Sequence, residues 1–453
     1  MSRLTILGGG AAGLSAAYFA HRAGVEFELF ERDLEPGGMC RTLRRGGHLY
    51  DAGAHRFHDL DAEITAEVKS LLGGELRPVR APSRIWTGGR YVDFPPTPLN
   101  AALSHGWSGA ARIALELLTA RRSRGPAASF EDFALQRFGP TLARRLLLDY
   151  AEKLWGLPAA RLSPEVATRR LRGMTLRTLV VELFASSRKT AHIDGEFLYP
   201  CLGYGQIAGR LAAALPEGRV FLGREIRGLE LDGRRVSRVR FKDGGQIECA
   251  DRVLSTLPLT LLARLLGDAL PGQAREAASR LRFRRLRLVF LRLSQPRVSD
   301  NASIYFPEPR FCVSRVSEPK NRSQAMAPAD ETSLLAEVPC FDGDALDRMP
   351  DAALAARVIA ELESVGLLCA PRVLDWAHEL LPHAYPVYSL DFERDARAVI
   401  EAVSSFENLD VLGRAGAFHY SHLHDQMRSA KDYVGRLAAG QERAVSAEAA
   451  ARP

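Results

Sequence analysis

The residues of this chain with the most informative spacing are three glycines near its start. Gly8, Gly10 and Gly13 form a G-x-G-x-x-G turn between an apolar strand pattern at 3–7 and an alanine-rich helix pattern at 14–22. The first glycine permits a tight turn, the second lets backbone approach a pyrophosphate, and the third allows close packing of helix on strand. The free N–H groups at the start of the helix would face the phosphates. The spacing therefore predicts a dinucleotide-binding turn.

An acidic residue at the end of the next strand supports this prediction. Residues 27–30 have a strand pattern, and Glu31 follows them at the place where a carboxylate accepts hydrogen bonds from the ribose of adenosine. Ala12 within the turn and Arg32 after the carboxylate are assigned to the same site. A glycine-rich turn without a ligand is the alternative for the motif alone, but the strand, helix and Glu31 in register favour a cofactor.

A second glycine motif follows at residues 37–42, with the sequence Gly-Gly-Met-Cys-Arg-Thr. It resembles the second glycine motif of the large FAD superfamily that includes amine oxidases, protoporphyrinogen oxidases, phytoene desaturases and UDP-galactopyranose mutases. The resemblance implies FAD rather than NAD as the cofactor, with Gly38 and Arg41 near its phosphates and ribose. A surface salt bridge is the alternative for Arg41.

The loop at residues 50–58 looks like a loop that runs beside the isoalloxazine ring in the mutases and in bacterial relatives of protoporphyrinogen oxidase. The resemblance implies that Gly53, Ala54 and His55 lie next to the flavin. A neutral imidazole at His55 could serve as an acid or base near pH 7, so His55 is a candidate catalytic residue. A structural hydrogen bond that shapes the loop is the alternative.

Residues 311–320 are also similar to both groups, and the mutase arginine that corresponds to Arg315 contacts the substrate diphosphate. Arg315 is therefore a second candidate catalytic residue that could clamp a phosphate or carboxylate, or else a paired structural arginine. The chain departs from the mutase pattern at three positions. His422 and His424 stand in place of aspartates, and Met174 replaces a second diphosphate-binding arginine. These departures leave the mutase activity in doubt.

The last segment looks like the one that closes the flavin site in the superfamily. A helix beginning near Leu423 would direct its first N–H groups at the flavin N1/C2 carbonyl, where negative charge develops on reduction. A helix that only packs is the alternative. The further residues assigned to the cofactor are Ile226, Gly413, Arg414, Leu423 and Gln426.

These patterns indicate an α/β fold: a Rossmann-type FAD-binding domain with an inserted helical unit and a β-sheet that covers the substrate. Helical patterns run over 110–122 and 130–154, and hairpin strands are expected between 220 and 249. The arginine run from Arg280 to Arg287 is expected at polar strand or hairpin positions. The predicted units are a discontinuous FAD-binding domain of residues 1–95, 192–270 and 382–440, a helical insertion of 96–191, and a substrate-domain sheet of 271–381.

Composition excludes several other classes of protein. Apolar residues make up 46% of the chain and charged residues 25%, as in an ordinary core-forming enzyme. The six cysteines are widely spaced, which argues against disulfides and zinc, and the group His419, His422 and His424 lacks the ligands that would complete a metal site. No apolar run is long enough for an integral membrane segment, and no signal peptide or nucleic-acid-binding stripe is evident. A cytoplasmic location is expected.

Three functions remain open, each with a small-molecule partner. The first is an oxidoreductase in which the substrate delivers hydride to flavin N5. The second is a mutase-like isomerase in which reduced N5 attacks a nucleotide sugar. The third is a flavin-binding protein without turnover. Because mutase-specific positions are altered, the oxidoreductase is preferred, with an amine, a sugar or an anionic compound as substrate. The sequence does not indicate an oligomeric state.

Overall fold

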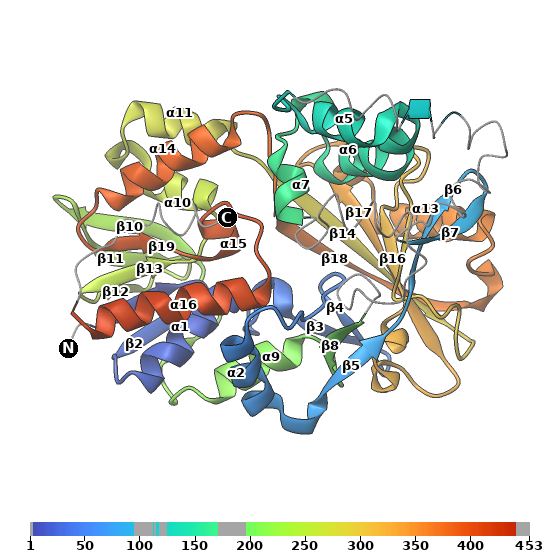
Figure 1. Ribbon diagram of the computed structural model, residues 1–453. Helices are drawn as coiled ribbons and strands as arrows, with labels where there is room; N and C mark the ends of the chain where they lie inside the picture. Colours follow the sequence, from blue (N-terminus) through green and yellow to red (C-terminus); the bar gives the residue numbers. More distant parts are fainter. Residues whose placement is uncertain (1–2, 95–111, 113–114, 117–124, 171–195, 441–453) are drawn as a thin grey trace.

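The computed structural model describes residues 3–94, 112, 115–116, 125–170 and 196–440. The fold is mixed α/β and is organised around one sheet of five strands and one of seven, which occupy opposite halves of the molecule (Figure 1). A three-stranded sheet and two two-stranded sheets accompany them.

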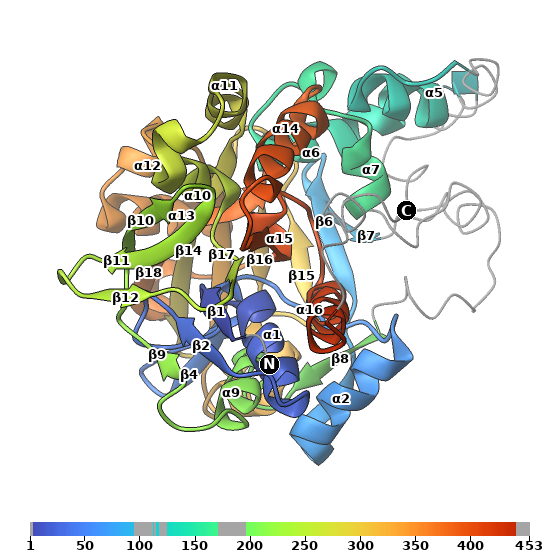
Figure 2. The same ribbon diagram turned by 90° about the vertical axis from the view of Figure 1, so that its left-hand side faces the viewer.

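The five-stranded sheet is parallel throughout, and its central strand is the first strand of the chain. Every residue of this strand is buried, as expected for a strand that is covered on both faces. The order is β19 (Leu409–Val411), β13 (Arg252–Ser255), β1 (Leu4–Leu7), β2 (Phe27–Phe30) and β9 (Val220–Phe221). Helices α1 (Ala11–Arg22) and α16 (Leu423–Ala438) run side by side next to this sheet (Figures 1 and 2). α1 begins three residues before the predicted start, because the last glycine of the turn is already helical.

A three-stranded antiparallel sheet packs next to the parallel one and confirms the predicted hairpins. Its strands are β10 (Ile226–Asp232), β11 (Arg235–Phe241) and β12 (Gln246–Glu248). Gly233 and Gly244 sit in the two turns with φ of 58° and 84°, a conformation that favours glycine. The two-stranded sheets pair β3 (Thr42–Arg45) with β4 (His48–Asp51) and β5 (Leu76–Arg80) with β8 (Glu196–Pro200).

The seven-stranded sheet supplies the other wall of the molecule. Its order is β18 (Val373–Pro386), β14 (Phe283–Leu293), β17 (Thr332–Cys340), β16 (Arg315–Ser317), β15 (Ser303–Tyr305), β6 (Ser83–Thr87) and β7 (Arg90–Phe94). β6 and β7 come from the 1–95 segment but join this sheet through parallel pairing of β15 with β6. Alternate residues of β14 face opposite sides: Leu288 packs into the core shared with the helical unit, and Val289 packs toward α13 (Asp351–Ser364).

The predicted helical run at 130–154 is helical but not continuous. It consists of α5 (Phe130–Ala143), a π-helical turn at Arg144–Leu148, and α6 (Asp149–Trp155), followed by α7 (Glu165–Arg170). Ser129 and Asp132 form a capping box at the start of α5, and Gly139 interrupts the helix at φ 71°. These helices lie over one edge of the seven-stranded sheet (Figure 1). Most of the predicted run at 110–122 lies outside the described residues.

Seven further α-helices lie in the described ranges. They are α2 (Ala62–Leu72), α9 (Gly205–Ala213), α10 (Leu259–Leu266), α11 (Gly272–Arg280), α12 (Ala345–Arg348), α14 (Phe392–Ser404) and the short α15 (Gly413–Gly416). None of the helices in the described ranges combines the length and the apolarity that crossing a membrane demands.

The prediction of polar positions for the arginine run was wrong at two residues. Arg284 and Arg287 lie on β14, but their side chains are buried. Arg284 donates to the carbonyl oxygens of Leu154 and Lys153 at 3.0 and 3.1 Å, at the end of α6. Arg287 donates to the Met349 carbonyl at 2.6 Å and pairs with Asp351. These partners come from distant parts of the chain. They replace the water that would otherwise solvate the two guanidinium groups, so both arginines can be buried.

Candidate functional site

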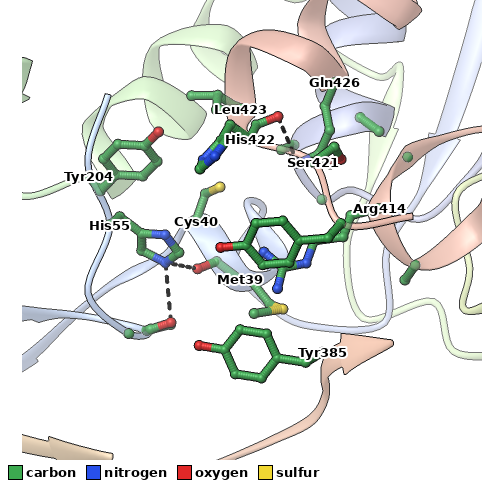
Figure 3. Close-up of a pocket in the computed structure, with 18 of the residues that line it drawn as sticks. Met39, Cys40, His55, Tyr204, Tyr385, Arg414, Ser421, His422, Leu423 and Gln426 are labelled. Atoms are coloured by element: carbon green, nitrogen blue, oxygen red, sulfur yellow. Dashed lines mark hydrogen bonds between the residues drawn. The ribbon is translucent and has the colours of Figure 1, made fainter. Parts of the chain in front are cut away.

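A cavity of about 310 Å³ lies between the glycine turn, the start of α16 and the seven-stranded sheet (Figure 3). The residues predicted for the site divide into two groups. Those that line the cavity are Gly10, Ala12, Gly53, Ala54, His55, Arg315, Gly413, Arg414, Leu423 and Gln426. Those that lie outside its lining are Gly8, Gly13, Glu31, Arg32, Gly38, Arg41 and Ile226. The fold therefore brings together residues that lie more than 400 positions apart in the sequence.

The glycine turn fits a closely held dinucleotide. A Cβ at Gly10 would meet no atom within 4 Å, so this backbone faces open space, whereas a Cβ at Gly13 would lie 1.9 Å from the Gly8 carbonyl oxygen. Gly8 itself has φ of 104°. In the described part of the chain, α1 has no side-chain cap and no acidic residue in its first turn. Its first N–H groups are thus available to an anionic ligand.

Glu31 has a structural task in addition to the role that was predicted for it. Its carboxylate accepts hydrogen bonds from the backbone N–H of Gly9 at 2.6 Å and of Asp33 at 2.9 Å. These bonds tie the glycine turn to the end of β2. Contact with a ribose stays a prediction.

Arg41 has the geometry of a salt-bridged residue. Its guanidinium lies 3.1 Å from the Asp33 carboxylate and 3.6 Å from that of Glu379, and its Nε donates to the Gly38 carbonyl at 3.0 Å. The guanidinium therefore holds the second glycine motif against neighbouring segments. A contact with the cofactor stays a prediction.

His55 is held at the cavity wall by two backbone carbonyl oxygens. Its Nε2 lies 2.7 Å from the Met39 oxygen and 3.2 Å from the Ala52 oxygen, so this nitrogen must carry the proton (Figure 3). The ring stacks on Tyr204 with centroids 4.9 Å apart. Burial lowers the pKa of His55 below its ordinary value. The imidazole is therefore neutral at pH 7 and shapes the loop, with Nδ1 as its remaining acceptor.

Arg315 is already paired with a buried carboxylate. Its Nη2 lies 2.7 and 2.8 Å from the two oxygens of Glu337, which is the residue directly opposite on β17. The same carboxylate accepts a hydrogen bond from the backbone N–H of Ala54 at 3.0 Å. Burial acts to lower the pKa of Arg315, but Glu337 holds it well above the usual range. Glu337 therefore links the cavity loop to the seven-stranded sheet, a link that the sequence did not reveal.

On the opposite wall, Arg414 lies beside two stacked tyrosine rings. The Arg414 guanidinium lies 4.3 Å from the centroid of Tyr420 and 5.1 Å from that of Tyr385, and the two rings are nearly parallel. Its Nη2 donates to the Ala384 carbonyl at 2.9 Å. Figure 3 shows Arg414 and Tyr385 across the cavity from His55.

The ionisable side chains of the cavity wall are basic rather than acidic. Its lining includes three arginines and four histidines, but no aspartate or glutamate among the described residues that form it: Arg56, Arg315, Arg414, His55, His58, His383 and His422. Arg56 and Tyr305 also line the wall, although the sequence did not single them out for the site. The only signal for Arg56 was its place next to His55 in the loop that had been singled out. Met174 lies outside the described residues.

The helix that ends the site begins at Leu423, as predicted, and is fixed at both its start and its side. The N–H of His422 donates to the Asp425 carboxylate at 2.8 Å. One turn later, Arg428 donates through Nε and Nη2 to the two oxygens of Asp61, each at 2.8 Å. Asp61 is also the N-cap of α2. The Arg428–Asp61 pair therefore anchors α16 against the amino-terminal part of the chain.

Asp61→Asn is expected to lower the free energy of unfolding at neutral pH by about 1 kcal/mol, since the pair is partly exposed. Asparagine retains the cap, so the difference in stability isolates the ion pair.

The pH dependence of the same pair follows from the pKa of Asp61, which is lowered to about 2, first by hydrogen bonds from Arg428. A depressed carboxyl pKa gives stability above the unfolded pKa that is lost as the pH falls through the folded one. The difference in free energy of unfolding between variant and wild type should narrow as the pH falls from about 4 to about 2 in urea unfolding curves. A constant gap would contradict this assignment.

Comparison with known proteins places these features in context. A family model described as flavin-containing amine oxidoreductase matches residues 11–401. A segment of 73 residues, 16% of this chain, is 37% identical to prenylcysteine oxidase 1 of Mus musculus, and it spans 14% of that protein.

Two solved structures share the fold over nearly the whole chain. A reduced UDP-galactopyranose mutase superposes with a TM-score of 0.85 at 20% identity, covering 98% of this chain and 97% of its own. A candidate protoporphyrinogen oxidase from Exiguobacterium sp. 255-15 superposes with a TM-score of 0.77 at 20% identity, covering 97% and 99%.

Proposed function

Because the chain belongs to the flavin-containing amine oxidoreductase family, we propose that it is an FAD-dependent oxidoreductase that takes hydride from a small organic substrate. The family and its flavoprotein neighbours imply FAD as the cofactor, which when bound supplies an acceptor for hydride at N5. The chain itself supplies binding, orientation and an electrostatic environment.

The observation that carries this proposal is the extent of the cavity. It begins at Gly10 and Ala12 beside the start of α1 and reaches Tyr305, Arg315 and Tyr385 on the seven-stranded sheet. We infer that the first N–H groups of α1 hold the cofactor phosphates and that those of α16 face the ring end. The sheet side chains would then enclose a substrate.

The same reasoning assigns the finer architecture. We infer a Rossmann-type FAD-binding domain from residues 1–95, 192–270 and 382–440, a helical insertion at 96–191, and a substrate-covering sheet at 271–381. β6, which pairs with β15, and β7, which pairs with β6, would complete that sheet.

A mutase-like isomerase that uses reduced flavin is the second candidate. The arginines of the cavity wall favour it, because the diphosphate of a nucleotide sugar needs cationic partners. A flavin-binding protein without turnover is less favoured, since the cavity extends beyond the glycine turn to the sheet.

Anaerobic mixing of the oxidised holoprotein with amines, porphyrinogens and nucleotide sugars separates these candidates. An oxidoreductase should lose its flavin absorbance on contact with its substrate alone. An isomerase should interconvert its sugar only after dithionite has reduced the flavin. A flavin-bound protein that neither loses its flavin absorbance nor interconverts a sugar with any of these compounds would contradict both catalytic assignments for the compounds tested.

A further inference from the structure

We propose that the substrate of this flavoenzyme carries an oxyanion, a carboxylate or a phosphate, and that Arg56 recognises it. This inference rests on the proposed function, because it assumes that a substrate enters the cavity. It adds the chemical class of that substrate and the residue that selects it. Arg56 follows His55 in the loop that lines the cavity, and its own side chain contributes to the wall.

The guanidinium of Arg56 has no carboxylate partner in the part of the chain that the structure describes. Its Nη2 donates to the hydroxyl of Ser83 at 3.1 Å, and its Cζ lies 5.0 Å from the ring centroid of Phe197. Burial lowers the pKa of Arg56, and the nearby cations Arg322 and Arg315 add to that effect. Arg56 is half-buried, and a charge partly withdrawn from water without a counter-charge is destabilising, so an anionic ligand would compensate it.

The other two arginines of the wall have different surroundings. Arg315 is neutralised by Glu337, whereas Arg414, on the opposite wall, donates to the Ala384 carbonyl and lies beside the stacked rings of Tyr385 and Tyr420. Arg322, which is buried near Arg56, donates to the Ala302 carbonyl and adds positive charge behind the wall. Of the two arginines that line this end of the cavity, Arg56 is therefore the one without a carboxylate partner among the described residues, and Arg315, the residue that the sequence had singled out, is paired.

The charge of the wall also argues against a cationic substrate. An ammonium group in the cavity would face three arginines without a carboxylate to pair with among the described lining residues. An oxyanion placed there would accept hydrogen bonds from the planar donors of Arg56 and benefit from the other cations.

Four small probes that share a phenyl ring but differ in charge test the charge preference of the cavity in the oxidised holoprotein at pH 7. Benzoate and phenyl phosphate are anionic, benzamide is neutral, and benzylamine is cationic. Titration followed by flavin absorbance and by calorimetry should show binding of at least one anion, with benzylamine bound at least about tenfold more weakly. The better anion identifies carboxylate or phosphate. Benzylamine affinity equal to or above that of both anions would overturn the proposal.

Replacing the arginine tests the residue. Arg56→Gln should weaken binding of the preferred anion by roughly tenfold to a hundredfold and leave benzamide unchanged, and Arg56→Lys should restore part of the loss. Arg84→Gln is the matched control, because Arg84 pairs with Asp93 on the exposed side of β6. Unchanged anion affinity in both Arg56 variants would overturn the assignment. If Arg56→Gln fails to fold, Arg56→Lys and the four-probe series still decide it.

These measurements separate the two proposals. Flavin content is determined first, and ligand binding needs no turnover. A protein that prefers anions but never loses flavin absorbance with any substrate would contradict the oxidoreductase alone. A protein that is reduced by its substrate but prefers benzylamine would contradict the anion site alone.

Discussion

Gly10→Val is expected to weaken FAD binding by at least about a hundredfold, or roughly 3 kcal/mol, while the apoprotein keeps most of its stability. The position faces open space, and its φ of −73° is one that valine adopts readily. The added side chain would therefore enter the space reserved for the pyrophosphate without straining the turn. The flavin-to-protein absorbance ratio after purification and reconstitution measures the first effect. Urea unfolding of the apoprotein measures the second.

Two other glycines serve as controls for this experiment. Gly209→Val in α9 adds the same side chain at an exposed position where nothing lies within 4 Å, and it should leave flavin content unchanged. Gly13→Ala should lower both flavin content and stability, because its Cβ would collide with the Gly8 carbonyl. A Gly10→Val protein that keeps its full complement of flavin would refute the assignment of the glycine turn to the cofactor.

Glu337→Gln is expected to lower the free energy of unfolding by about 3–5 kcal/mol, because it leaves the buried charge of Arg315 without its partner. The glutamate side chain is 1% exposed and that of the arginine 14%, so water cannot replace the carboxylate as the partner of the guanidinium. The variant keeps an amide oxygen for the Ala54 N–H, which limits the change largely to charge. Unfolding in urea at pH 7 provides the measurement.

A double-mutant cycle distinguishes this pair from general damage to the sheet. The variant that combines Glu337→Gln with Arg315→Gln should be more stable than the sum of the two single changes implies. Additive losses would show that the two side chains act independently and would remove the argument that Arg315 is already neutralised.

The features that the sequence predicted well are those set by neighbouring residues. The strand at 27–30 and the hairpin turns at Gly233 and Gly244 depend on local patterns of apolar residues and glycines. The glycine turn belongs to the same class, because its three glycines are needed within six consecutive residues. The start of α16 at Leu423 was expected from the resemblance of the last segment to the flavin superfamily.

What the sequence could not predict depends on partners that lie far away along the chain. β6 joins the seven-stranded sheet only through β15, more than 200 residues later. Arg284 is buried because carbonyl groups at the end of α6 receive it. Arg56 and Arg315 look alike in the sequence, and only the position of Glu337 shows that one is compensated and the other is not.

The order of strands in the parallel sheet bears on how the protein is made. β1 leaves the ribosome long before its neighbour β13 (Arg252–Ser255), which follows about 250 residues later, and β19 (Leu409–Val411) and α16 follow still later. During synthesis β2 can pair with one edge of β1, but the other edge of β1 stays open and α1 lacks its neighbour α16 until those later segments have been made. These apolar surfaces are therefore open to aggregation for much of synthesis, and the cavity can close around a cofactor only after α16 has been made.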